Sequence, residues 1–192
     1  LVAGPIERAE NLMGQLFSRH KFNSVNISIG IKFMIMGYFK KVVIADRAAI
    51  LVDTVYNSTE DFGGIAIIIA TLFFTFQIYC DFSGYSDIAI GCAKTFGIDL
   101  MKNFNRPYFS VSIKDFWRNW HISLSSWLKD YVYIPMGGSR CILIRKYFNL
   151  MVTFLLSGLW HGANWTFVLW GGLHGFYQVI GDLKNKIFKT DR

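Results

Sequence analysis

The sequence predicts an all-α membrane protein, a polytopic bundle of helices. Of its 192 residues, 53% are hydrophobic and 17% aromatic, and the mean hydropathy of +0.32 is too apolar for an ordinary soluble domain. Residues 62–80 form an uncharged run of about the length that a helix needs to cross roughly 30 Å of hydrocarbon. Residues 148–180 form a second uncharged run, which is too long for one upright span.

Upstream of the first uncharged run, residues 27–44 are apolar apart from three lysines. Residues 42–56 add acidic and basic side chains, so we expect a span with charged helix ends, whose lysines reach toward the interface. Residues 62–80 form the next span. Residues 81–100 open on two aspartates and two serines, so we expect this tract to enter the membrane from a polar turn.

Residues 102–111 show no helical stripe, and Pro107 pushes the residue before it toward extended geometry, so they should form a loop. In residues 113–138, by contrast, seven mainly aromatic side chains recur at helical spacing. At about 100° per residue they share one face of a helix that lies at the interface or re-enters the protein, and Pro135 with two glycines ends it. The seven are Trp117, Trp120, His121, Leu124, Trp127, Leu128 and Tyr131.

The long run 148–180 should be two helices that meet near residues 158–164, where glycines and an asparagine gather. No internal repeat or low-complexity linker interrupts the chain, so we expect residues 1–192 to belong to a single domain. The chain starts at Leu1 and has no signal segment, which predicts a fragment whose flanks hold further spans.

The formal net charge is +7, and the excess is concentrated in residues 102–146. Basic loops beside apolar spans usually face the cytoplasm, so topology and attraction to lipid head groups are the simplest explanation. A more specific explanation of the basic residues is a binding site for an anionic ligand. Nucleic acid is not expected as a partner, because membrane-like segments separate these charges. The basic residues are Lys102, Arg106, Lys114, Arg118, Lys129, Arg140, Arg145 and Lys146, against Asp115 and Asp130.

Two of the four histidines occupy positions in apolar surroundings, where a polar side chain is unexpected. His161 lies inside the second uncharged run, where an ionisable side chain is either functional or a neutral histidine bonded to a neighbouring helix. His121 lies at the edge of the tryptophan-rich face, where its imidazole either faces a cavity or packs at the interface. His174 is a third polar group without an obvious partner, and His20, in a polar loop, is expected to be uninvolved.

Other reaction templates fit less well. Residues 81–87 lack the second glycine of the GxSxG elbow, so a serine hydrolase is not supported. No phosphate-binding loop, dinucleotide fingerprint or HExxH motif occurs in the sequence. The three cysteines match no zinc spacing and are expected to be buried thiols. A haem or metal site at His121 and His161 stays open.

Four tracts in order resemble the membrane-bound O-acyltransferase (MBOAT) family, and within it the bacterial branch that O-acetylates exopolysaccharides such as alginate. They are AGPIERA, QIYCDFSGYSDIAIG, NFNRPYFSVSIKDFWRNWHISLSSWLKDYVYIPMGG and LSGLWHGANWTFVLWGGLHG, and the resemblance covers nearly the whole chain. It implies helices around a buried funnel or tunnel, in a multi-pass protein of the cell inner membrane. The family has more spanning segments than this chain can hold, so N-terminal and C-terminal helices are expected to be missing.

The family's two recurrent active-site positions map onto His161, through LWHGANW, and His121, through FWRNWHISLS. The chemistry implied is transfer of an acetyl group from acetyl-CoA toward a hydroxyl of an extracytoplasmic polysaccharide, through a partner protein. We expect His161 to act as general base toward the accepting hydroxyl, and His121 to orient that hydroxyl or stabilise the oxyanion. No bound cofactor or metal is expected. Candidates for donor or substrate binding are Lys114, Arg118, Trp117, Trp120 and Asn164.

Three rival interpretations remain. In a membrane transporter or channel, the two histidines would line a proton or solute path. In a haem or metal protein they would be ligands, which a visible absorption spectrum would reveal. An acyltransferase with a different acceptor would D-alanylate teichoic acid or acetylate peptidoglycan. The motifs IPMGG and WHGANW are more similar to the alginate-type branch.

Overall fold

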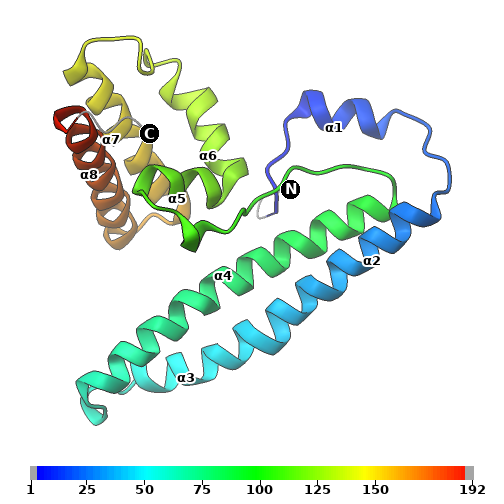
Figure 1. The fold of residues 1–192 in the computed structure, drawn as a ribbon, viewed down its shortest axis with the longest axis horizontal. Coiled ribbons are helices and arrows are strands. Elements are labelled where there is room, and N and C mark those ends of the chain that lie inside the picture. The colour runs from blue at the N-terminus through cyan, green and yellow to red at the C-terminus, as the bar shows by residue number, and fades with distance from the viewer. Residues whose placement is uncertain (1–3, 189–192) are drawn as a thin grey trace. The chain divides into compact units, whose positions relative to one another are not determined.

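The computed structural model describes residues 4–188, and within this range the chain forms helices, turns and loops without a β-strand (Figure 1). It divides into two compact units between Asn103 and Phe104. The α-helices of the first unit are α1 (Ala9–Leu16), α2 (Ser24–Tyr38), α3 (Asp46–Tyr56) and α4 (Gly64–Thr95). Those of the second unit are α5 (Ile113–Asn119), α6 (Ile122–Leu128), α7 (Leu143–His161) and α8 (Trp165–Ile187).

The first unit is built on α4, which has 32 residues and runs antiparallel to α2 (Figure 1). Within residues 4–188, α4 is the one helix long and apolar enough to cross a membrane, and it contains most of the span predicted at 62–80. The polar turn predicted from residue 81 is wrong, because α4 continues unbroken through this tract. Upstream, α2 leads through a π-helical segment, Phe39–Ala45, directly into α3.

Two ion pairs explain why α4 tolerates its aspartates. Lys40 Nζ lies 2.6 Å from Asp87 Oδ2, and Lys41 Nζ lies 2.5 Å from Asp81 Oδ1. Both lysines belong to the π-helical segment, whose wider turn is a departure from regular helix often found at functional sites. Pairing with a lysine reduces the cost of burying a carboxylate, so the helix does not have to break at either aspartate.

Two pairs of glycines bring the backbones of α2 and α4 into contact. A Cβ added to Gly30 would lie 2.5 Å from the carbonyl oxygen of Gly91, and one added to Gly37 would lie 2.6 Å from that of Gly84. Side chains larger than hydrogen cannot occupy these positions without separating the helices. This close approach of small residues is typical of helix pairs in membranes.

The second unit contains an antiparallel hairpin of α7 and α8, packed closely at Gly158 and Gly171. The two helices meet at residues 162–164, which confirms the break predicted near 158–164. Asn164 is the N-cap of α8, because its side-chain oxygen accepts a hydrogen bond of 3.1 Å from the backbone N–H of Thr166.

The single helix predicted from residue 113 is wrong, although the loop at 102–111 is confirmed, with one short 3₁₀ turn at Pro107–Phe109. Helix α5 ends at Asn119, Trp120 is extended, and His121 has φ 45° and ψ 54°. This left-handed conformation is costly for a residue other than glycine, and it interrupts the helix between α5 and α6. After α6, a π-helical segment, Lys129–Tyr133, leads into left-handed Gly137 and Gly138. The seven side chains therefore do not share one helical face.

Candidate functional site

His121 occupies the elbow between α5 and α6, and its side chain is only 1% exposed. Its Nδ1 atom lies 3.5 Å from the hydroxyl of Ser123, which is fully buried. Burial, and to a smaller extent the charge that neighbouring His161 can carry, lowers the pKa of His121 to about 4. At neutral pH its imidazole is therefore uncharged, and one ring nitrogen carries a proton while the other can accept one.

The residue before the histidine is fixed by aromatic packing. The Trp120 ring is 9% exposed and lies 5.1 Å from Phe104, 5.5 Å from Phe116 and 6.0 Å from Tyr108 between ring centroids. These rings come from the loop before α5 and from α5 itself. Because Trp120 is extended and points into this cluster, the next residue turns back toward α6.

His161 is the last residue of α7, and Trp160 connects it to the elbow. The Trp160 ring lies 5.7 Å from the His121 ring and 5.1 Å from the His161 ring, with edge-to-face geometry in both contacts. On its other side, His161 contacts Trp170 of α8 at 5.1 Å. The two histidines, which lie 40 positions apart in the sequence, are thus brought to one place by α6, α7 and α8.

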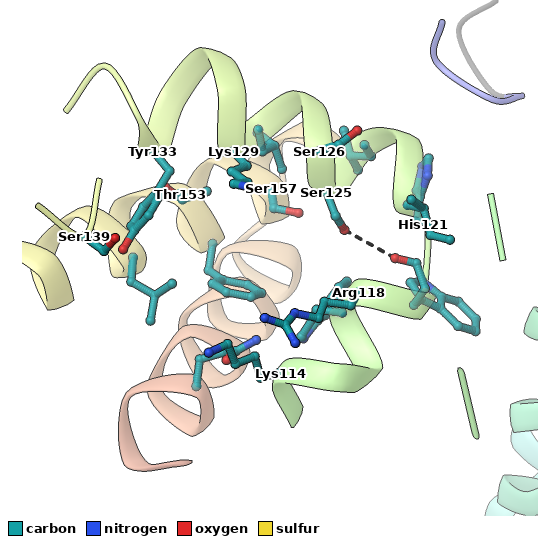
Figure 2. Close-up of a pocket in the computed structure, with 18 of the residues that line it drawn as sticks. Lys114, Arg118, His121, Ser125, Ser126, Lys129, Tyr133, Ser139, Thr153 and Ser157 are labelled. Carbon is teal, nitrogen blue, oxygen red and sulfur yellow. Dashed lines mark hydrogen bonds between the residues drawn. The ribbon is translucent and has the colours of Figure 1, made fainter. Parts of the chain in front are cut away.

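A cavity of about 600 Å³ includes both histidines in its lining. Figure 2 shows side chains of α5, α6 and α7 around this space, with His121 at one end and Tyr133 and Ser139 at the other. Between them lie the hydroxyl groups of Ser125, Ser126, Thr153 and Ser157.

The cavity lining is strongly basic. Four cationic side chains face one carboxylate, that of Asp182, which pairs with Lys146 and also accepts a hydrogen bond from Tyr147. Arg118 lies 3.5 Å from Asp115, an exposed pair that contributes little stability. An anion entering the cavity would therefore meet excess positive charge. The four cations are Lys114, Arg118, Lys129 and Lys146.

Six of the seven residues predicted for the site line this cavity, and Asn164 does not. The six are Lys114, Trp117, Arg118, Trp120, His121 and His161. His174 packs against the rings of Trp170 at 4.7 Å and Trp117 at 5.1 Å. His20 belongs to the first unit, where its Nε2 atom lies 2.7 Å from the backbone oxygen of Gln15.

Sequence reasoning missed part of the lining. Lys129 and Lys146 belong to the basic stretch, which is the signal that could have found them. Asp182 and Gln178 gave no such signal, because α8 brings them to the cavity from far along the chain.

The chain belongs to the membrane-bound O-acyltransferase (MBOAT) family, whose model matches residues 1–190. It is 47% identical over 180 residues to the probable alginate O-acetylase AlgI of Azotobacter vinelandii, covering 94% of this chain and 36% of the relative. It is 46% identical over 177 residues to the peptidoglycan O-acetyltransferase of Helicobacter pylori, and this match covers 91% of this chain and 34% of the relative.

A more distant relative is the teichoic acid D-alanyltransferase of Streptococcus thermophilus, which is 29% identical over 179 residues, covering 84% of this chain and 42% of the relative. The chain spans about a third of the length of the first two relatives, 36% and 34%. The resemblance read from the four sequence tracts is thereby confirmed at the level of the family.

Proposed function

We propose that this chain carries the catalytic histidines of a membrane O-acyltransferase that moves an acetyl group from acetyl-CoA toward a hydroxyl of an extracytoplasmic polysaccharide such as alginate. The observation that carries the proposal is the convergence of His121 and His161 on one basic cavity, with Trp160 in contact with both rings. Relatives named as an alginate O-acetylase and a peptidoglycan O-acetyltransferase support the reaction class.

In the proposed mechanism, His161 is the general base. An alcohol attacks a thioester slowly until its proton is removed, and a positioned imidazole contributes about 10²- to 10⁴-fold to the rate. The oxygen–hydrogen bond of the acceptor breaks as its oxygen bonds to the acetyl carbon, and the thiolate of coenzyme A leaves. His161 would then return the proton to the thiolate.

His121 would orient the acceptor hydroxyl or stabilise the oxyanion that forms on the acetyl carbonyl. Its low pKa supports this role, because a neutral imidazole can donate its ring N–H without a full charge in the resting site. Burial keeps the ring in one orientation, and a preorganised donor is more effective than a mobile one.

Lys114 and Arg118 would attract the phosphates of acetyl-CoA, from the cytoplasmic side. Both extend from α5 toward the same space (Figure 2). Trp117 and Trp120 also belong to the lining of the cavity. Asn164 would contribute to substrate binding indirectly, by capping the start of α8, two residues after Gly162.

We place the site in a multi-pass protein of the cell inner membrane, around a funnel or tunnel that α5 and α6 enter without crossing the bilayer. The chain would form one part of that membrane domain, since it spans about a third of its relatives, and further helices would complete it. A partner protein would carry the acetyl group onward to the polysaccharide.

Peptidoglycan is the second candidate acceptor. The identity to the peptidoglycan O-acetyltransferase, 46%, is nearly equal to that of the alginate O-acetylase relative, 47%. The donor and the histidine chemistry would be the same, so only the acceptor differs.

The test uses membrane vesicles that contain the complete gene product and radiolabelled acetyl-CoA, with alginate or peptidoglycan fragments and candidate partner proteins supplied. Wild-type protein should transfer label to a hydroxyl acceptor or to the partner. His161→Ala and His121→Ala should lose this transfer at equal protein level, whereas His20→Ala, a histidine of the first unit, should keep it. Flux of a solute without any labelled product would instead support a transporter.

A further inference from the structure

Two residues other than glycine adopt the left-handed conformation within residues 4–188, and both belong to the second unit. They are Arg106, with φ 49°, and His121, with φ 45°. Such residues cost free energy and persist only where their surroundings hold them in place. Contacts with neighbouring residues must therefore hold the elbow that contains His121.

Asparagine side chains connect the two strained positions. The backbone N–H of Asn105, directly before Arg106, donates to the carbonyl oxygen of Asn119, two residues before His121, at 2.9 Å. The Asn105 side-chain amide also donates to Asn119 Oδ1, at 3.3 Å. Neighbouring residues of both turns are thus bonded to each other through backbone and side chain.

The amide of Asn119 makes two further bonds. Its Nδ2 atom donates to the backbone oxygen of Asp115, at 2.8 Å, and to the hydroxyl of Ser110, at 3.3 Å. The first bond closes the last turn of α5, and the second binds the loop that carries the aromatic cluster around Trp120. One side chain therefore ends the helix and attaches it to the loop.

We infer that Asn119 is a positioning residue for His121: with Asn105 it fixes the loop 105–110 against the end of α5 and so holds the left-handed elbow that keeps the His121 imidazole buried in the cavity. The inference on catalysis rests on the proposed function, but the inference on geometry does not. Asn119 itself is not in the cavity lining, so it acts through His121 rather than on a substrate.

The test reads the burial of His121 directly, by carbethoxylation with diethyl pyrocarbonate in membrane vesicles, followed by peptide mass spectrometry. In the wild type, His121 should react slowly, and exposed His20 serves as the internal standard. Asn119→Ala should raise the rate at His121 by about 10-fold, because loss of these bonds increases the open population of the elbow. Asn57→Ala, a matched change at an exposed asparagine of the first unit, should leave the rate unchanged.

Two more variants keep the test decisive if Asn119→Ala fails to accumulate. Asn119→Asp preserves size and the Oδ1 acceptor but removes both Nδ2 bonds, and Asn105→Ala removes only the bond to Oδ1. Each should give a smaller increase in the modification rate of His121.

In the acetyl-transfer assay, the same variants should lower kcat by about 10- to 100-fold with little change in the KM for the donor. An unchanged His121 rate in all three variants would overturn the inference, whether or not the wild type transfers acetyl groups. Faster His121 modification with unchanged kcat would retain the geometry and remove the catalytic consequence.

Discussion

At the scale of single residues, His121 combines three properties: a left-handed backbone, a side chain only 1% exposed, and a pKa lowered to about 4. Burial favours the neutral imidazole, and the elbow conformation aims it into the cavity. Asparagine tolerates the same backbone better than most residues, which makes it a useful replacement.

This arrangement predicts a pH dependence of folding. An unfolded histidine titrates near pH 6.5, whereas folded His121 titrates near pH 4, so between these values the unfolded chain binds more protons. The stability contributed by the neutral form is complete above about pH 6.5 and is lost as pH falls toward 4, by about 3 kcal/mol in all.

The measurement is thermal unfolding of the detergent-purified protein from pH 7.5 to 4.5. The wild type should lose more stability on acidification than His121→Asn, which keeps a polar side chain suited to the elbow but cannot titrate. Parallel melting curves for the two proteins would contradict the assigned pKa.

At the scale of elements, glycines determine how closely α2 and α4 approach. We predict that Gly37→Val destabilises the first unit by about 1–3 kcal/mol, because its Cβ would meet backbone atoms of Gly84 and Ile88 within 3 Å. Gly181→Ala in α8 is the control, since nothing lies within 4 Å of the added Cβ, and it should stabilise the helix by up to about 1 kcal/mol. Thermal unfolding in detergent measures both; equal effects would count against backbone contact.

The ion pair between Lys40 and Asp87 makes a second prediction at this scale. Both side chains are mostly buried, 23% and 19% exposed. Lys40→Met should cost about 2 kcal/mol, because it leaves a carboxylate without its partner, and Lys40→Met with Asp87→Leu should recover most of that loss. A double variant as unstable as the single one would mean that the pair itself stabilises the helix contact.

The sequence allowed the span in α4 and the break between α7 and α8 to be predicted, because uncharged length and local glycines determine both. It did not allow the unbroken course of α4 past Asp81 to be predicted, since the neutralising lysine lies 40 positions away. The elbow at His121 was missed for a related reason: helical periodicity continues through residues 117–131, and the hydrogen bonds of Asn105 and Asn119 override it. Most of the predicted site residues reached one cavity because α5 and the elbow that follows it carry them as neighbours.

At the scale of the whole molecule, charge is unevenly divided. Residues 1–103 contain nine basic and nine acidic side chains, whereas residues 104–192 contain eleven basic and four acidic ones, so the second part carries the whole net charge of +7. The cavity belongs to that part. An anionic donor should therefore be attracted to the second unit over a distance set by screening.

We predict that the apparent KM for acetyl-CoA rises several-fold between about 0.05 and 0.5 M salt, because screening weakens attraction to the cationic lining. Lys114→Glu with Arg118→Glu should raise the KM at low salt and flatten this dependence, with folding intact by thermal unfolding. Arg47→Glu, in the first unit, is the control for overall charge. A KM that responds neither to salt nor to the charge reversal would exclude this role for the two residues.

The length of α4 has a consequence for the bilayer itself. Its 32 residues extend about 48 Å, so an upright helix would exceed a hydrocarbon layer of roughly 30 Å, and even a tilt of about 40° leaves about 37 Å of depth. One end of α4 must therefore extend out of the hydrocarbon layer. That end cannot be residues 64–80, because this half of the helix is uncharged and apolar. The half that carries Asp81 and Asp87 therefore lies toward the polar boundary, where head groups reduce the cost of its two ion pairs. A thicker bilayer would draw these pairs into hydrocarbon, so lipid chain length becomes a physical variable that acts on the contact between α2 and α4.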